Sequence, residues 1–275
     1  MSQNGVWEFA GKTDPGCVRA NNEDGLAIDE DLGLLIVADG MGGHNSGEVA
    51  SELAISTIRS FARRMLGGEK TMVALGGDPL LSARAQLLEH FVESANTMIF
   101  EKGRAFPRDA GMGTTVVAVL VDQKSVAVAH VGDSRLYLFR GGVLSQLTED
   151  HSLVGDQLRR GLITPEAAAH STLQNILTRA LGAESIVKVD VAEHPVFPGD
   201  ILILSTDGLD KMVSDEEVAN VLREDSTPAR VVDVLVRLAR QAGGTDNITV
   251  VCARLGSSRP QGLWGKMSGF LQGRP

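Results

Sequence analysis

The chain has 275 residues and a formal net charge of −9 at pH 7, with 43% hydrophobic and 22% charged residues. Because no long Lys/Arg run offsets this acidity, the composition argues against a nucleic-acid-binding protein. No stretch approaches the roughly 18 consecutive apolar residues of a membrane-spanning helix. The first seven residues lack a signal-peptide pattern, and Cys17 and Cys252 have no CxxC spacing. We therefore expect a cytoplasmic protein with reduced thiols that contacts no membrane.

The first half of the chain predicts strands, then two helices, then more strands. Strands are expected at 6–13 and 25–38, and Asn45 or Ser46 is expected to cap a helix in which Glu48 completes a capping box. Apolar residues at helical spacing continue to Met65, and a second helix is expected from about Leu80 to Lys102. Hairpin-forming strands are expected next, at 115–121, 126–131, 135–139 and 143–147.

The second half predicts a helix-turn-helix insertion at 151–171, strands at 187–191 and 201–204, helices at 214–223 and 228–242, and a last strand at 248–254. Because the helices come in pairs and do not alternate with strands, the pattern favours antiparallel sheets with helices on the outer faces, an α+β layered sandwich. We expect one domain at 5–255. The segment 256–275 is expected to be a flexible tail, or alternatively a short docking segment, and to be dispensable for catalysis.

Four aspartates lie at the ends of apolar runs. Asp39 follows 34–38 and opens a glycine-rich turn, Asp133 follows 127–131, Asp207 follows 201–206, and Asp246 precedes 248–251. One Asp-Gly pair after a strand is usually only a turn. Four of them favour a single acidic metal site, and a site of oxygen ligands without Cys selects Mg²⁺ or Mn²⁺ over zinc.

Ordered motifs along the chain give a more specific interpretation. They are Thr13-Asp-Pro-Gly16, Arg19, Asn22-Glu-Asp24, Asp39-Gly-Met-Gly-Gly-His44, Gly111-Met-Gly-Thr-Thr115, His130-Val-Gly-Asp-Ser-Arg135, Leu147-Thr-Glu-Asp-His151, Leu177-Thr-Arg-Ala-Leu-Gly182, Ser205-Thr-Asp-Gly208 and Gly244-Thr-Asp-Asn247. The set closely resembles the metal-dependent protein serine/threonine phosphatases (PPM family, type 2C) in their compact bacterial form. The resemblance covers about residues 5–255 and implies a four-layer α-β-β-α sandwich of two antiparallel sheets flanked by helices.

The resemblance also implies a dinuclear centre at one edge of the sandwich. Asp39 is expected to bridge two cations, the carbonyl of Gly40 to bind one of them, and Asp207 and Asp246 to complete the protein ligands. Two such ions can share and deprotonate a bridging water that attacks phosphorus. Arg19 matches the family's phosphate-binding arginine, and its alternative is a surface salt bridge with Glu23 or Asp24.

Three positions depart from a simple match. Met41 stands where many relatives have a histidine, so His44 is either the general acid for the leaving alkoxide or a structural turn residue. Asp133 matches a residue that helps bind a third, weaker metal in the family. The family's second ligand for that metal matches Lys211, and an ammonium repels cations, so we expect the third site to be absent or weakened.

The function implied by the resemblance is hydrolysis of phosphoserine and phosphothreonine in proteins. The resemblance also implies a monomer that acts in signal transduction together with a partner Ser/Thr kinase. The insertion 151–171 corresponds to the family's flap beside the active site. An alternative is a pseudophosphatase that binds phosphoproteins without turnover, for which Lys211 is the only support. A third interpretation, an unrelated dinuclear nuclease or phosphodiesterase, fits the acidic charge and the order of motifs poorly.

Overall fold

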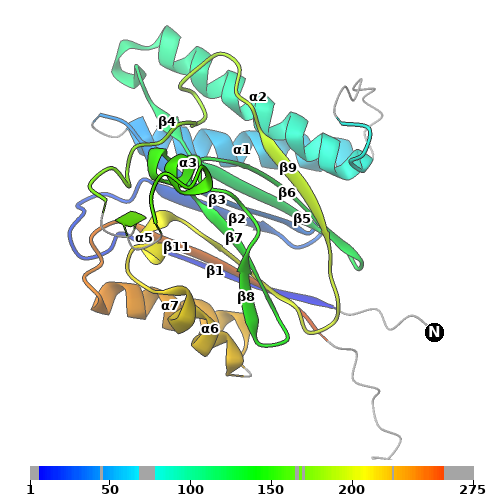
Figure 1. Cartoon of the computed structure of the whole chain (residues 1–275). Helices are drawn as coiled ribbons and strands as arrows, with labels where there is room; N and C mark the ends of the chain where they lie inside the picture. Colours follow the sequence, from blue (N-terminus) through cyan, green and yellow to red (C-terminus); the bar gives the residue numbers. More distant parts are fainter. Residues whose placement is uncertain are drawn as a thin grey trace, which may run out of the picture.

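The computed structural model describes residues 6–43, 46–67, 78–164, 167–168, 171–224 and 226–256. Two antiparallel β-sheets pack face to face, and a pair of helices covers the outer side of each (Figure 1). This is the expected four-layer α-β-β-α sandwich. In the part of the chain described, no helix combines the length and the apolar character needed to cross a bilayer.

The first sheet has six strands and lies under the long helices α1 (Ser46–Leu66) and α2 (Ala83–Ala105). A single 3₁₀ turn, η1, follows α2 at Pro107–Asp109. The strand order is β2-β3-β5-β6-β9, with the short β4 paired to β3. Their bounds are β2 Asp24–Asp29, β3 Leu34–Met41, β4 Gly113–Thr114, β5 Val116–Val121, β6 Ser125–Val131 and β9 Asp190–Pro195.

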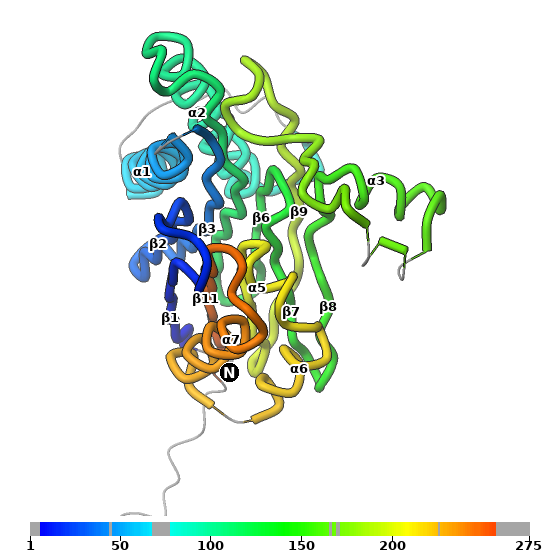
Figure 2. The backbone as a smooth tube through the Cα atoms, turned by 90° about the vertical axis from the view of Figure 1, so that its left-hand side faces the viewer, coloured from blue at the N-terminus to red at the C-terminus, as the bar shows by residue number. Residues whose placement is uncertain are grey.

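The second sheet has five strands and packs its outer face on α6 (Asp215–Arg223) and α7 (Pro228–Gln241). The order β1-β11-β10-β7-β8 comprises β1 Trp7–Asp14, β11 Ile248–Leu255, β10 Ile201–Ser205, β7 Arg135–Arg140 and β8 Val143–Gln146. The short helices α3 (Leu153–Arg159) and α5 (Asp207–Asp210) lie outside the layers. Figure 2 shows α3 standing apart from both helix pairs.

The two-residue period of the strands explains why three apolar layers form. In β3, Leu34 and Ile36 face the α1–α2 layer, while Leu35 and Val37 face the other sheet. Residues of β11 alternate in the same way between the α6–α7 layer and the space between the sheets. Strands buried on both faces therefore read as continuous apolar runs, and the antiparallel pairing brings their polar ends together at one edge.

Local capping signals set the starts of α6 and α7. Ser214 and Glu217 form a capping box at α6, and Thr227 caps α7 with Pro228 in its first turn. The residue preceding α1, Asn45, lies outside the described part, so its capping role is untested. The strand predicted at 187–191 forms, but it begins later than predicted, at Asp190, where β9 pairs with β6. Val187 and Val189 instead pack into the layer under α1 and α2.

The insertion after Asp150 begins with a helix as predicted, α3. Of the expected second helix only residues 167–168 are described, and both are helical, so its extent stays a prediction. Ser152 caps α3 through a hydrogen bond from Gly155 N at 3.1 Å. The segment projects beside the edge of the sandwich where the aspartates gather (Figures 1 and 2).

Candidate metal centre

The antiparallel connections bring the predicted aspartates to one end of the sandwich. Asp39 is in the last part of β3, Asp133 follows β6, Asp207 follows β10, and Asp246 precedes β11. Burial and the four carboxylates of Asp24, Asp207, Asp133 and Asp246 raise the pKa of Asp39 well above its usual range. The carboxylates thus form one electrostatically connected cluster in which negative charge is concentrated.

Asp24 belongs to the same cluster. It lies opposite Asp39 in the β2–β3 pair, so both side chains leave the same face of the sheet. Thr206 Oγ1 donates to Asp24 Oδ2 at 2.8 Å, whereas Asp24 Oδ1 is buried without a hydrogen-bond partner among the described residues. Burial, with Asp207 and Asp246 nearby, raises the pKa of Asp24 to about 7.

Asp207 begins the short helix α5, and its two oxygens differ in their surroundings. Oδ2 forms an ion pair with Lys211, one helical turn later in the chain. Oδ1 is buried and has no hydrogen-bond partner among the described residues. An orphaned buried carboxylate oxygen is costly unless a cation or water satisfies it. Asp207 Oδ1 is therefore available as a metal ligand.

Asp246 joins the cluster to the loop that carries Arg19. Arg19 Nη2 lies 2.9 Å from Asp246 Oδ2, and Arg19 is largely exposed. The expected salt-bridge alternative, with Glu23 or Asp24, is not the pair that forms. Asn247 anchors the loop by donating to the carbonyls of Pro15 and Asn21 and by accepting from Glu23 N.

Close backbone contacts explain two glycines of the site. A Cβ at Gly40 would overlap the carbonyl oxygens of Gly47 and Glu23, and a Cβ at Gly208 would overlap the carbonyl oxygen of Asn247. Only glycine lets these segments approach so closely. Thr114 Oγ1 donates a hydrogen bond to Asp39 O, and Thr115 Oγ1 accepts one from Asp39 N, so both hydroxyls hold the backbone of Asp39.

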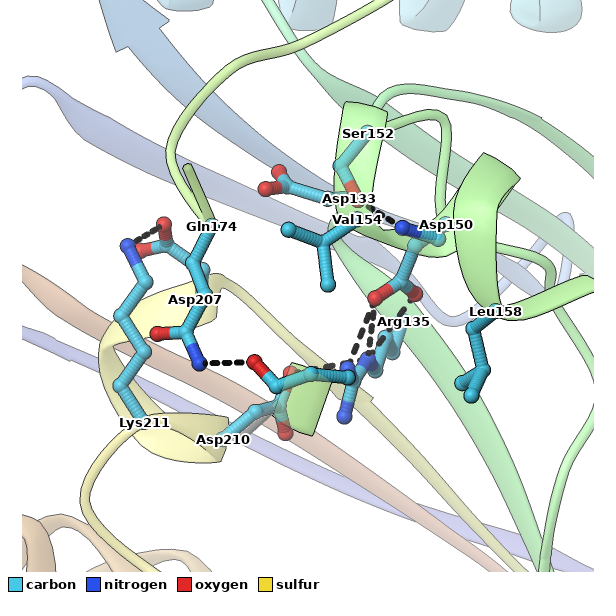
Figure 3. A pocket seen from close by; sticks show the side chains of 12 residues that line it. Asp133, Arg135, Asp150, Ser152, Val154, Leu158, Gln174, Asp207, Asp210 and Lys211 are labelled. Carbon is cyan, nitrogen blue, oxygen red and sulfur yellow. Dashed lines mark hydrogen bonds and ion pairs between the residues drawn. The ribbon is translucent and has the colours of Figure 1, made fainter. Parts of the chain in front are cut away.

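A cavity of about 380 Å³ opens beside the cluster (Figure 3). Asp133, Asp207 and Lys211 line one part of it, and Val154 and Leu158 form an apolar part. Burial, together with the charges of Asp207 and Asp150, raises the pKa of Asp133 to about 7. Arg135 pairs with Asp150 at 2.7 Å and is thereby neutralised within the cavity wall.

The residues of the cluster fit a pair of hard divalent cations. All the donors are oxygens, and Asp24 Oδ1 and Asp207 Oδ1 are buried without partners among the described residues. Burial and the neighbouring carboxylates raise the pKa values of Asp24, Asp39 and Asp133. The predicted residues Asp39, Asp207, Asp246 and Asp133 are brought together, and Gly40 adjoins them on β3. Arg19 reaches them through Asp246, whereas His44 lies outside the described residues.

Sequence reasoning gave no role to Thr206 or Asn247. Each bridges segments roughly 180 to 230 residues apart in the chain. Only the position of Asn247 directly after Asp246, in the motif Gly244-Thr-Asp-Asn247, pointed to it.

Asn247→Ala is expected to destabilise the fold by about 1–3 kcal/mol, because it removes the three hydrogen bonds by which the buried Asn247 side chain holds the 15–23 loop. Urea unfolding of the metal-free protein measures the change. Asn220→Ala on the exposed face of α6 is the control, with an expected effect within about 0.5 kcal/mol. Equal effects of the two substitutions would contradict the anchoring role.

The fold and the carboxylate cluster define a candidate metal-dependent hydrolase, and known proteins agree. The family model described as Protein phosphatase 2C matches residues 18–247. The serine/threonine phosphatase stp of Listeria monocytogenes is 39% identical over 243 residues, covering 87% of this chain and 92% of that protein. Protein phosphatase PhpP of Streptococcus pneumoniae is 35% identical over 241 residues, covering 86% of this chain and 93% of its own.

Solved structures lead to the same family. The serine/threonine phosphatase PstP/Ppp of Mycobacterium tuberculosis has a TM-score of 0.79 and 36% identity, covering 91% of this chain and 99% of that one. A structure of the PstP catalytic domain in complex with two manganese ions has a TM-score of 0.77 and 36% identity, covering 92% and 99%. The chain belongs to the protein phosphatase 2C family.

Proposed function

We propose that the protein hydrolyses phosphoserine and phosphothreonine in other proteins, with two Mn²⁺ or Mg²⁺ ions as cofactors. The observation that carries the proposal is the cluster of Asp39, Asp207 and Asp246 with unpartnered buried carboxylate oxygen at its centre. Two bound divalent ions would supply an activated water and neutralise the phosphoryl oxygens. Asp39, the carbonyl of Gly40, Asp207 and Asp246 would hold the ions, with Asp133 at the margin.

Arg19 is proposed to bind the substrate phosphate. Its guanidinium is exposed and close to the cluster, and its partner Asp246 would be engaged by cations in the loaded enzyme.

Arg19→Ala is expected to raise KM for a phosphopeptide about tenfold or more with a smaller change in kcat, because it removes uniform phosphate binding. Arg19→Lys should recover only part of the affinity, since an ammonium lacks the bidentate fork. Steady-state kinetics and a manganese titration of each variant test the role. Unchanged KM together with lost metal binding would contradict it.

His44 is proposed as the acid that protonates the leaving alkoxide, against the alternative of a structural turn residue. His44→Gln should slow hydrolysis of an alkyl phosphate by about 10²-fold while barely affecting an aryl phosphate, whose leaving group needs no proton. Rates on both substrates decide between the two roles. An equal loss on both would favour the structural alternative.

The proposed setting is a reducing, cytoplasmic compartment, where a monomeric phosphatase would oppose a Ser/Thr kinase in signalling. Both cysteines are free thiols, Cys17 exposed and Cys252 buried, which suits such a compartment. We propose one domain over residues 5–255 with a dispensable tail at 256–275, where all residues beyond Gly256 lie outside the described part.

One assay tests the central proposal. Purified protein should release phosphate from phosphoserine and phosphothreonine peptides in the presence of Mn²⁺, and EDTA should abolish the release. Phosphopeptide binding without turnover would instead support the pseudophosphatase alternative, which the intact set of carboxylates disfavours.

A further inference from the structure

The segment beside the cavity is attached to the sandwich through a narrow neck. We define the neck as residues 151–153 and 176–179, which enclose α3 and the rest of the insertion. Leu153 N donates to Ile176 O and Thr178 N donates to His151 O, both at 2.8 Å. Ser152 and Leu177 form a β-bridge between the two limbs.

A single carboxylate connects both limbs of the neck to the first sheet. Asp190, the first residue of β9, accepts a hydrogen bond from His151 Nε2 at 3.1 Å and one from Arg179 Nη1 at 2.7 Å. His151 belongs to one limb and Arg179 to the other. Burial opposes the charged form, but Arg179 and His151 hold the pKa of Asp190 well below its usual range.

His151 also bonds to Gly132, the residue that precedes Asp133 in the candidate metal centre. Its ring is fully buried, and its Nδ1 accepts a hydrogen bond from Gly132 N at 3.1 Å. The backbone N–H of His151 donates to Gly132 O at 2.9 Å, so both polar groups of Gly132 are held by one residue. Gly132 has φ +109° and directly precedes Asp133.

The bonding pattern fixes the state of the ring. Because Gly132 N–H donates to Nδ1, the ring hydrogen must lie on Nε2, where it faces Asp190. Burial and the neighbouring His130 lower the pKa of His151 to about 4, so the ring is neutral at physiological pH. The carboxylate of Asp190 favours the same tautomer.

By distance alone, His130, His151 and Asp190 could hold a metal ion, since one ligand atom of each lies within 4.8 Å of the others. The existing partners argue against that use. His130 Nε2 bonds to Glu149 O, both ring nitrogens of His151 are engaged, and Arg179 already neutralises Asp190. The group is a protein-only hydrogen-bond network.

We propose that Asp190 and His151 are positioning residues for the phosphatase reaction, which fix the neck against Gly132 and so hold the apolar cavity wall of Val154 and Leu158 beside Asp133. This inference rests on the proposed function. A protein substrate must pass this wall to bring its phosphate to the carboxylate cluster, whereas a small aryl phosphate needs only the cluster itself.

The test is Asp190→Asn, which preserves side-chain shape and removes the charge shared by both limbs. KM for a phosphopeptide should rise at least about tenfold, while KM for a small aryl phosphate changes less than about twofold. Backbone hydrogen exchange over 152–160 and 171–178 should accelerate in the same variant. Arg179→Gln, which releases one limb, should shift both measurements in the same direction and serves if Asp190→Asn does not fold.

Asp200→Asn is the matched control. Asp200 is buried, accepts from Arg140 at 2.7 Å and lies before β10, at the opposite end of that strand from Asp207. It should lower Tm without changing the KM ratio of the two substrates. The proposal would be overturned if Asp190→Asn and Arg179→Gln kept the KM values and hydrogen exchange of the wild type. It would also be overturned if Asp200→Asn raised KM for the phosphopeptide and left KM for the aryl phosphate unchanged. Hydrogen exchange needs no turnover, so an inactive wild-type protein would refute the proposed function separately.

Discussion

Asp39→Asn is expected to reduce manganese-dependent turnover by about 10²–10³-fold, equivalent to roughly 3–4 kcal/mol of transition-state stabilisation. The reason is that Asp39 is the residue on which the charges of Asp24, Asp207, Asp133 and Asp246 converge, and the amide cannot replace a bridging carboxylate. Steady-state hydrolysis of an aryl phosphate over a range of Mn²⁺ concentrations measures the loss. Near-wild-type activity would show that the site assignment is wrong.

In the absence of metal, Asp39→Asn should raise the stability of the fold, because the carboxylates of the cluster repel one another. A carboxyl whose folded pKa is raised stabilises the fold fully only below its unfolded pKa, and this stability is lost as pH rises through the folded pKa. For Asp24 that window runs from its ordinary value of 3.8 to about 7. The metal-free protein should therefore lose stability across this window.

Asp39→Asn removes one member of the repelling cluster, so its metal-free Tm at pH 7 should exceed that of the wild type. Mn²⁺ should raise the Tm of the wild type and barely change that of the variant. Thermal unfolding with and without Mn²⁺ separates loss of the site from loss of the fold. A variant with lower Tm in both conditions would mean that Asp39 is a structural residue instead.

The carboxylate cluster was predictable because its signal is local. Asp39, Asp207 and Asp246 each adjoin an apolar run that must be a buried strand, and antiparallel pairing of such strands brings their ends to shared edges. The layered fold followed from paired helices between blocks of strands. Neither inference needed the register of any strand pair.

What could not be predicted depends on register and on distant contacts. The pairing of Asp24 with Asp39 is set by the β2–β3 register. His151 meets Asp190 only because β9 begins at Asp190, opposite His130 of β6. The apolar spacing of 187–191 predicted a strand there, whereas the pairing of β6 with β9 placed it later. Periodicity identifies a buried face and leaves the partner undetermined.

Lys211→Asp is expected to add a third, low-affinity manganese-binding step to a protein that otherwise binds two ions. Lys211 pairs with Asp207 and lines the cavity with Asp133, where a third cation would otherwise find carboxylate ligands. Burial disfavours its charge, but Asp207, Asp133 and Asp246 raise its pKa, so the ammonium persists. At about 4 Å from a divalent ion, that charge repels it by several kcal/mol at a near-surface dielectric.

Lys211→Met distinguishes repulsion by the ammonium from the lack of a carboxylate ligand, because it removes the charge without supplying a ligand. Calorimetric titration should give two steps for the wild type, two steps with tighter binding for Lys211→Met, and three steps for Lys211→Asp. A wild type with three steps would mean that Asp210 or water completes a third site despite the ammonium. Asp210 lines the same cavity but is poorly suited to this, since its carboxylate already accepts hydrogen bonds from Tyr137 and Ser205 and lies 3.7 Å from Arg135 Nε. The ammonium, which pairs with Asp207 and lines the same cavity as Asp133, is therefore expected to disfavour a third ion there.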